Sequence, residues 1–150
     1  MAETPVNNVS RALGMAFGAV LLAHPLQPAF ACSCAAPTPE LAYDQASVVF
    51  VGTVAGIERP FTDRIGITDS GAHLIRFTVT RRWKGVAPAI VTIRAPLTGE
   101  ACGYPFREGE AYLVYAIGSV RLASGLCTGT KELSIAGEDL RAIEALARTE

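Results

Sequence analysis

Four cysteines, Cys32, Cys34, Cys102 and Cys127, are the residues of this 150-residue chain with the clearest capacity for chemistry. Thiols can pair as disulfides, or four of them can hold a zinc ion in a tetrahedral Cys₄ site. Zinc sites usually take their ligands in pairs separated by about two to four residues. Here only Cys32 and Cys34 are close, and their spacing is tighter. The even number and the spacing favour two disulfides, with a zinc site as the alternative.

The segment ahead of Cys32 has the layout of a secretory signal peptide. An apolar run from Ala12 to Ala23 follows Arg11, and the segment ends in the small-residue triplet Ala29-Phe30-Ala31. A basic start, an apolar middle and a small-residue cleavage site are the three parts of such a signal. We therefore expect residues 1–31 to be removed on export, which makes Cys32 the first residue of the mature chain.

Two alternatives to cleavage are a membrane anchor and a lipid anchor. A membrane span needs roughly 18 or more apolar residues, and the run is interrupted well before that length by His24, Pro25 and Gln27. Lipid attachment to Cys32 is the second alternative, although Ala29 and Phe30 fit a lipoprotein signal poorly. We expect residues 32–150 to form a single domain that is secreted or periplasmic and has no membrane span.

The spacing of the cysteines also limits which of them can pair. A bond between Cys32 and Cys34 would close a very small ring, and an extended C-x-C segment does not bring its side chains together as a disulfide requires. Each of the two should therefore bond to a distant cysteine and close a loop of about 70 to 95 residues. Such a loop is worth about 4 to 5 kcal/mol in the chain-entropy model.

Charge and composition exclude some classes of partner. The formal net charge is −1, and the only basic cluster is Arg81-Arg82-Trp83-Lys84 at the end of an expected strand. Binding to nucleic acid or to an anionic membrane depends on clustered positive charge. We therefore expect no nucleic-acid partner.

Beyond the signal, the sequence predicts about five short strands. The segment 47–57 is apolar on both faces, whereas 74–83 alternates between apolar and polar residues. These patterns are typical of a doubly buried strand and of a half-buried strand, respectively. Three further strands are expected over 90–94, 111–117 and 120–128.

Two short helices are expected on either side of the strands. Thr38 and Pro39 offer a cap and a first-turn proline for a helix near 38–46. Near 138–148, apolar residues recur on one helical face, with acidic residues in the first turn. Five strands and small helices in about 120 residues predict a mainly β fold, a five-stranded OB-fold barrel, with a sandwich as the alternative.

Other candidates for chemistry are weak. Asp69, Ser70 and His73 include the residue types of a catalytic triad, but they fall in one turn, whereas a triad needs a base held between nucleophile and carboxylate. Glu108 and Glu110 are expected to be turn charges beside a glycine. Trp83 and three tyrosines alternate with apolar residues, as core residues do; these tyrosines are Tyr104, Tyr112 and Tyr115. We expect no enzyme activity and no cofactor.

Several motifs together resemble a known family. The expected mature chain opens with C-S-C, Pro39 precedes a short helix with Tyr43, the strand Val48-Val49-Phe50-Val51-Gly52 follows, and Cys102-Gly103-Tyr104 comes later. This order resembles the inhibitory domain of the tissue inhibitors of metalloproteinases and the netrin-like modules with the same OB barrel, including bacterial relatives. The resemblance covers Cys32 to about Thr130 and implies disulfides from Cys32 to Cys102 and from Cys34 to Cys127.

The resemblance also implies a mechanism. In the family, the free α-amine and carbonyl of the first cysteine chelate the catalytic zinc of the target protease, and the second residue enters its specificity pocket. Cys32 and Ser33 would take these roles here. The protease-binding surface would comprise Cys32, Ser33, Cys34, Ala35 and Ala36, together with Gly99, Glu100, Ala101 and Cys102.

The chain departs from the animal inhibitors in two respects. Asp44 stands where they carry a further cysteine, and their second disulfide-rich domain is missing. The sequence is therefore compatible with two functions. The first is inhibition of an extracellular zinc metalloprotease. The alternative is an exported netrin-like module that binds another exported protein or assembles with it, without inhibitory activity.

Overall fold

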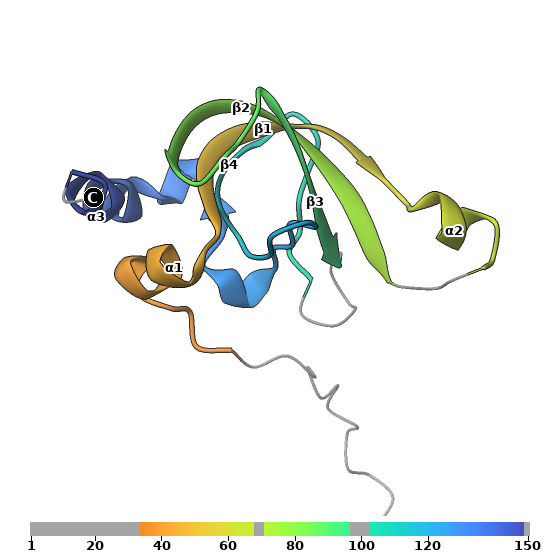
Figure 1. Ribbon diagram of the computed structural model, residues 1–150, viewed down its shortest axis with the longest axis horizontal. Coiled ribbons are helices and arrows are strands. Elements are labelled where there is room, and N and C mark those ends of the chain that lie inside the picture. The colour runs from red at the N-terminus through yellow and green to blue at the C-terminus, as the bar shows by residue number, and fades with distance from the viewer. Residues whose placement is uncertain (1–33, 68–70, 97–102, 149–150) are drawn as a thin grey trace, which may run out of the picture. The chain divides into compact units, whose positions relative to one another are not determined.

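The protein is mainly β, with a five-stranded antiparallel sheet and short helices. The computed structural model describes residues 34–67, 71–96 and 103–148. Within these residues the sheet has the order β3-β2-β1-β4-β5 (Figure 1). The strands are β1 (Val48–Glu58), β2 (Ala72–Lys84), β3 (Ile90–Pro96), β4 (Ala111–Ala116) and β5 (Lys131–Glu132). The first four lie close to the strands predicted from the sequence.

The central strand β1 is buried on both faces, as its apolar pattern predicts. Phe50 and Val54 belong to one core, and Val49 and Val51 belong to a second core, as expected for strand residues that point alternately to the two faces of a sheet. In β2, Ile75 and Phe77 are buried, whereas Arg76 and Thr78 are exposed. That alternation confirms the half-buried strand.

Aromatic rings fill the first core. Phe77 is fully buried and makes edge-to-face contacts with Phe50, Phe106 and Tyr112 at centroid distances of 5.5 to 6.4 Å. Tyr104 packs against the same Tyr112 at 5.8 Å. Such pairs add about 0.5 to 1.5 kcal/mol each beyond the area that they bury. The buried positions of Tyr104, Tyr112 and Tyr115 confirm that these tyrosines belong to the core.

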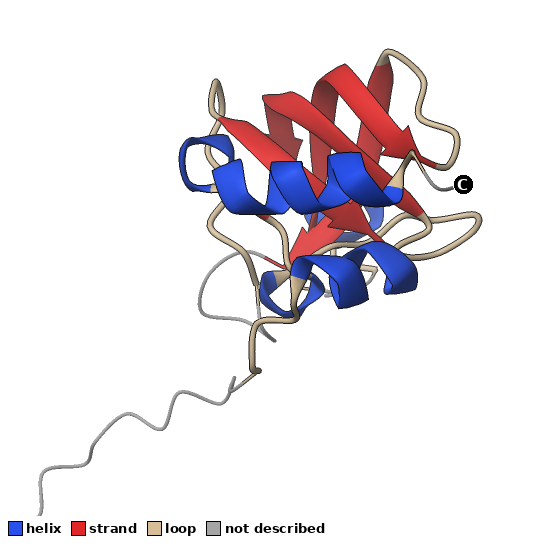
Figure 2. Cartoon of the chain, turned by 90° about the vertical axis from the view of Figure 1, so that its left-hand side faces the viewer, coloured by secondary structure: helices blue, strands red, loops and turns tan. Residues whose placement is uncertain are grey.

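Two helices cover the second core. They are α1 (Pro39–Gln45) and α3 (Gly137–Leu146), which lie side by side on one face of the sheet (Figure 2). Thr38 caps α1, because its Oγ1 accepts a hydrogen bond from the N–H of Leu41 at 3.3 Å. Both helices agree with the prediction to within two residues.

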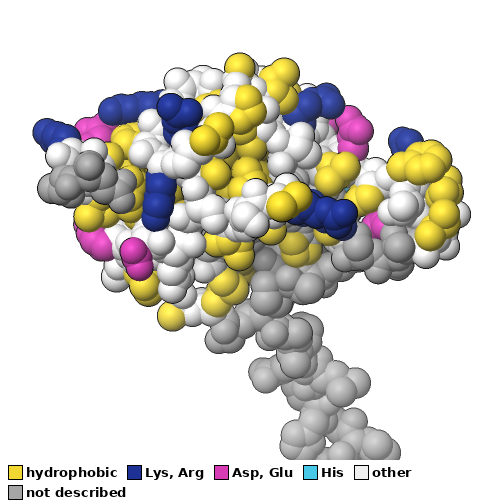
Figure 3. Space-filling model, in the orientation of Figure 1, with side chains coloured by type: hydrophobic (Ala, Val, Ile, Leu, Met, Phe, Trp, Pro, Cys, Tyr) yellow, Lys and Arg dark blue, Asp and Glu magenta, His cyan; other side chains and the backbone are white. Residues whose placement is uncertain are grey.

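A third helix, α2 (Phe61–Arg64), was not predicted. It lies at the end of the hairpin between β1 and β2 and projects from the body of the protein, where apolar side chains gather on its surface (Figure 3). Phe61, Ile65 and Ile67 are 51 to 70% exposed. Only four residues are helical, too few for a periodic apolar pattern to indicate a helix.

The sequence predicts a five-stranded barrel, but among the described residues the hydrogen-bonded sheet remains open and does not close into one. The expected strand over 120–128 does not form; Ala123 makes isolated bridges to Arg94 and Ile117, and a 3₁₀ helix, η3 (Leu126–Thr128), follows. Glycines with positive φ, Gly118 and Gly129, flank this segment. They turn the chain away from an extended path. The fifth strand is instead β5, which pairs with β4.

The 3₁₀ helix η4 (Leu133–Ile135) connects β5 to α3. Among the described residues, no helix is long and apolar enough to cross a membrane.

Candidate functional site

The predicted binding surface is described only in part. Cys34, Ala35 and Ala36 lead into α1; Cys34 is half-buried, and both alanines are exposed. The other members of the surface lie outside the described residues: Cys32, Ser33, Gly99, Glu100, Ala101 and Cys102. The expected disulfide between Cys32 and Cys102 therefore also lies outside them, as does the expected signal peptide 1–31.

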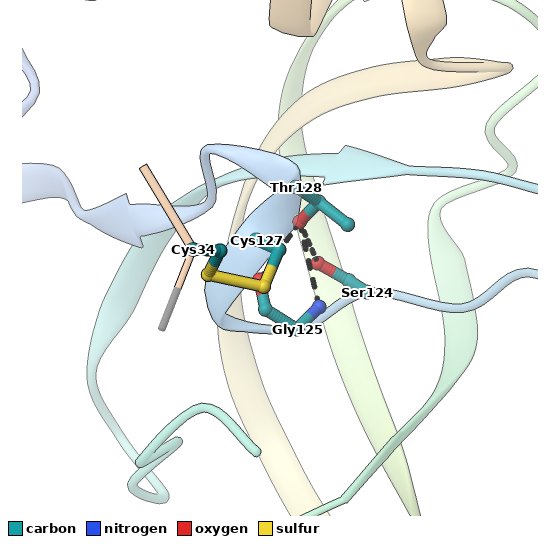
Figure 4. Close-up of a disulfide and its surroundings, with 5 residues drawn as sticks. All are labelled: Cys34, Ser124, Gly125, Cys127 and Thr128. Atoms are coloured by element: carbon teal, nitrogen blue, oxygen red, sulfur yellow. Dashed lines mark hydrogen bonds between the residues drawn. A yellow bond between two sulfur atoms is a disulfide. The ribbon is translucent and has the colours of Figure 1, made fainter. Parts of the chain in front are cut away.

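A disulfide joins Cys34 to Cys127 (Figure 4), with 5.6 Å between the α carbons and a sequence separation of 93. This is the pair implied by the family resemblance. Both sulfurs are consumed by the bond, and zinc binding needs free thiolates. The alternative of a Cys₄ zinc site is therefore incompatible with this structure.

A network of hydroxyl groups holds the turn that carries Cys127. Ser124 Oγ lies 3.0 Å from Thr128 Oγ1, and Thr128 Oγ1 donates to the carbonyl of Gly125 at 2.9 Å (Figure 4). Ser124 Oγ also lies 2.7 Å from Thr130 Oγ1. The N–H of Tyr115 in β4 donates to Thr130 Oγ1 at 3.0 Å. Ser124 and Thr130 are buried. The disulfide is thus anchored to the sheet through a satisfied polar network.

The sequence carries no signal that places these hydroxyls in the site. Serine and threonine are common in turns, and each can bond to several nearby backbone groups. Nothing in the spacing of Ser124, Thr128 and Thr130 indicates that all three oxygens meet. The positive φ of Gly129, 88°, is what folds Thr130 back towards the other two.

A small pocket lies beside the disulfide. Its volume is about 210 Å³, and its lining includes Cys127, Pro96 and Ile117. The carbonyl of Pro96 accepts a hydrogen bond from the N–H of Tyr104 at 3.1 Å, so Tyr104 lies next to a residue that lines this pocket. The expected binding surface has two halves, 32–36 and 99–102. Cys34 of the first half, and Pro96 shortly before the second, therefore lie near the same pocket.

A buried polar cluster attaches α3 to the sheet. Tyr115 OH donates to Asp139 Oδ2 at 3.3 Å, and Lys131 Nζ donates to Asp139 Oδ1 at 2.9 Å. Burial raises the pKa of Tyr115 above its ordinary value, and the negative charge of Asp139 and the hydrogen bond to it raise it further. Tyr115 is thereby held as a neutral hydrogen-bond donor. The pKa of Tyr104 is also raised, mainly by burial.

Neither a protein-family model nor a curated protein sequence matches this chain.

The other candidates are scattered across the fold. His73 lies on β2, with its Nδ1 buried and without a hydrogen-bond partner among the described residues, whereas Asp69 and Ser70 lie outside these residues. Glu108 accepts a hydrogen bond from the N–H of Ile57 at 2.9 Å and so holds a turn. In the described part of the chain, no three His, Cys, Asp or Glu side chains cluster in a way that could hold a metal ion.

The basic cluster at the end of β2 is engaged within the fold. Arg81 stacks over the ring of Trp83 at 4.6 Å and forms an ion pair with Glu144 of α3 at 2.8 Å. Lys84 Nζ donates to the backbone carbonyls of Tyr43 and Asp44 in α1. The cluster therefore has a structural role, because it joins β2 to α1 and α3.

Proposed function

We propose that this chain is an exported netrin-like module that inhibits zinc metalloproteases through its mature N-terminus. The observation that carries the proposal is the disulfide between Cys34 and Cys127. It attaches the chain, two residues after Cys32, to a hydrogen-bonded turn that lies 93 residues later than Cys34 in the sequence. A terminus held in this way loses little conformational freedom when it binds, which favours affinity.

An OB-type arrangement of the strands is part of the same proposal. β1, β2 and β3 are consecutive neighbours, β4 returns to the other side of β1, and Ala123 bridges Arg94 in parallel and Ile117 in antiparallel fashion. The OB-fold is a partly open Greek-key barrel of five strands. An incompletely closed sheet with these neighbours supports that assignment.

The chemistry of inhibition would be supplied by the first mature residue. An α-amine has a pKa of about 8 and loses its proton readily, and catalytic zinc keeps one coordination position open. The amine and carbonyl of Cys32 would bind the zinc of the protease, with Ser33 in the specificity pocket. Ala35 and Ala36 are exposed and carry small side chains, so a protease can approach the segment that follows. Residues 99–102 would form the second half of the surface.

The state of the mature N-terminus tests the proposal. The exported protein is purified, its intact mass is measured, and its inhibition of a panel of zinc metalloproteases is compared with that of a variant carrying one extra alanine before Cys32. We expect the native species to begin at Cys32 and to inhibit, and the extended species to lose inhibition, because its amine is displaced from the zinc.

A matched control is Asp44→Ala, an exposed change on α1 that leaves the terminus free. It should inhibit as the native protein does. Equal potency of the native and extended species, or no inhibition by either, would refute chelation and favour the alternative, an exported binding or structural module. A diacylglycerol mass on Cys32 would indicate a lipid-anchored module instead.

A further inference from the structure

The open side of the sheet forms a groove between β3 and the segment that follows β4. On the edge of β3 that faces away from β2, Arg94 forms two backbone hydrogen bonds to this segment. Its N–H donates to the carbonyl of Leu122 at 2.8 Å, and its carbonyl accepts from the N–H of Ser124 at 3.1 Å. Residues of both segments, within 90–94 and 120–122, line a common space. The space between them has a volume of about 380 Å³, within the size range of ligand pockets.

The edge of β3 in this groove has backbone groups that are available for pairing. Successive residues of a strand direct their N–H and C=O groups to opposite sides. Arg94 directs both groups away from β2, so Thr92 and Ile90, on the same side of the ladder, do likewise. The carbonyl of Ala89 bonds instead to the N–H of Val79 in β2, as this alternation requires. Among the described residues, none forms a hydrogen bond to the backbone of Thr92.

The groove combines apolar surface with positive charge. Ile90 is 59% exposed and Val120 is 93% exposed, on opposite sides of the space. Two arginines, Arg94 and Arg121, are part of the lining, and no acidic residue of the described chain is part of it. Arg121 is exposed and forms no ion pair with another described residue. A ligand that matches this surface offers backbone hydrogen bonds, apolar side chains and a carboxylate.

We propose that this groove binds an extended, acidic segment of a partner protein, which adds as a short strand to the edge of β3. Its backbone pairs with Thr92, its apolar side chains lie between Ile90 and Val120, and a carboxylate meets Arg121. Strand addition to an exposed edge is a general mode of peptide recognition. A second copy of this chain fits less well, because it would bring a second Arg121 rather than a carboxylate to a groove whose described lining has no acidic residue.

This site does not depend on the proposed inhibition. None of the residues that line the groove belongs to the N-terminal binding surface. A protein whose groove is blocked should still inhibit a metalloprotease, and one with an extra N-terminal alanine should still bind the peptide. Failure of one proposal is therefore distinguishable from failure of the other.

Amide NMR with a defined peptide tests the site. The probe is acetyl-Val-Glu-Val-Glu-Val-amide, an extended acidic peptide, and the control peptide has lysine in place of glutamate. In the free protein, the amide of Thr92 should exchange with solvent much faster than those of Val91 and Ile93, which face β2. The acidic peptide should slow the exchange of Thr92 and shift its resonance and that of Leu122.

Three variants separate the contributions. Arg121→Glu removes the positive charge that would meet the carboxylate of the peptide, and Val120→Asp removes the apolar contact. Thr92→Pro removes the backbone N–H on the edge of β3, at a position where an edge strand tolerates proline. Each should weaken binding by at least about tenfold, which is 1.4 kcal/mol. Matched controls are Arg82→Glu and Val86→Asp, exposed changes outside the groove that should leave the affinity unchanged.

Several results would overturn the proposal. The first is that the resonances of Thr92 and Leu122 do not shift at about 1 mM peptide, where binding is already weak. The second is that the lysine peptide binds equally well, and the third is that Arg121→Glu leaves the affinity unchanged. Dimerisation of the peptide-free protein that shields Thr92 would assign the groove to a second copy instead. If Thr92→Pro does not fold, Val120→Asp decides, since its side chain is almost fully exposed.

Discussion

The disulfide between Cys34 and Cys127 connects the segment before α1 to the turn before β5, across 93 residues of sequence. The hydroxyl network around Ser124 holds the second cysteine, so the path of the chain into α1 is set by residues from the last part of the sequence. We therefore expect the position of Cys34 to depend on the integrity of that turn.

Replacing both Cys34 and Cys127 by serine should lower the free energy of unfolding by about 4 kcal/mol, because the unfolded chain regains the entropy of a long closed loop. Urea unfolding without reductant measures the difference. The control is the native protein under the same conditions. Coincident unfolding curves for the two proteins would contradict a disulfide of structural importance.

Asp139→Asn should lower the free energy of unfolding by about 1 to 3 kcal/mol. The carboxylate is buried, and its loss leaves Lys131 without its ion-pair partner. Urea unfolding again provides the measurement. Glu138→Gln, an exposed change in the same turn of α3, is the matched control and should stay within about 0.5 kcal/mol of the native value. Equal losses in both variants would argue against the buried cluster.

Stability should fall at alkaline pH because the pKa of Tyr115 is raised in the folded protein. In the unfolded chain the phenol has a pKa of about 10. The contribution of Tyr115 is therefore fully present below about pH 10 and is lost as the pH rises towards the folded pKa, with a slope of up to about 1.4 kcal/mol per pH unit. Unfolding free energies measured between pH 8 and 11 by urea titration test this expectation.

Tyr115→Phe is the control for this pH dependence. It should cost about 1 kcal/mol at neutral pH through loss of the hydrogen bond to Asp139, and it should flatten the alkaline decline. A shallower decline should remain, because the pKa of Tyr104 is also raised. An unchanged slope in the variant would show that Tyr115 is not responsible.

Gly85→Ala should destabilise the protein more than Gly66→Ala. Both glycines have positive φ, 70° and 74°, so each substitution introduces backbone strain of about 1 kcal/mol. At Gly85 the new Cβ would also lie 2.3 Å from the carbonyl oxygen of Ser47, whereas at Gly66 it would meet nothing within 4 Å. Thermal unfolding compares the two, and equal melting temperatures would contradict the close approach at Gly85.

Much of the sheet could be predicted because its strands carry local patterns. The two-sided apolar run of β1 and the alternation in β2 each follow from where a strand directs successive side chains. The strand predicted over 120–128 does not form. Its apolar residues have the pattern of a strand, but Gly118 and the hydrogen bond from the hydroxyl of Thr128 turn the chain. Hydrogen bonds between side chains and the backbone compete with the hydrogen bonds of a β-sheet, and residue types alone do not show which of the two will form.

By itself, the sequence determined the mainly β class, four strands, two helices and the exclusion of a bond between Cys32 and Cys34, since these depend on local periodicity and local geometry. The tertiary structure alone decided that the sheet stays open, that three hydroxyls meet behind Cys127, and that Thr92 faces a groove lined by Arg121. Those features arise between residues that are distant in sequence. Their contacts depend on how far strands and turns curve, which no local pattern specifies.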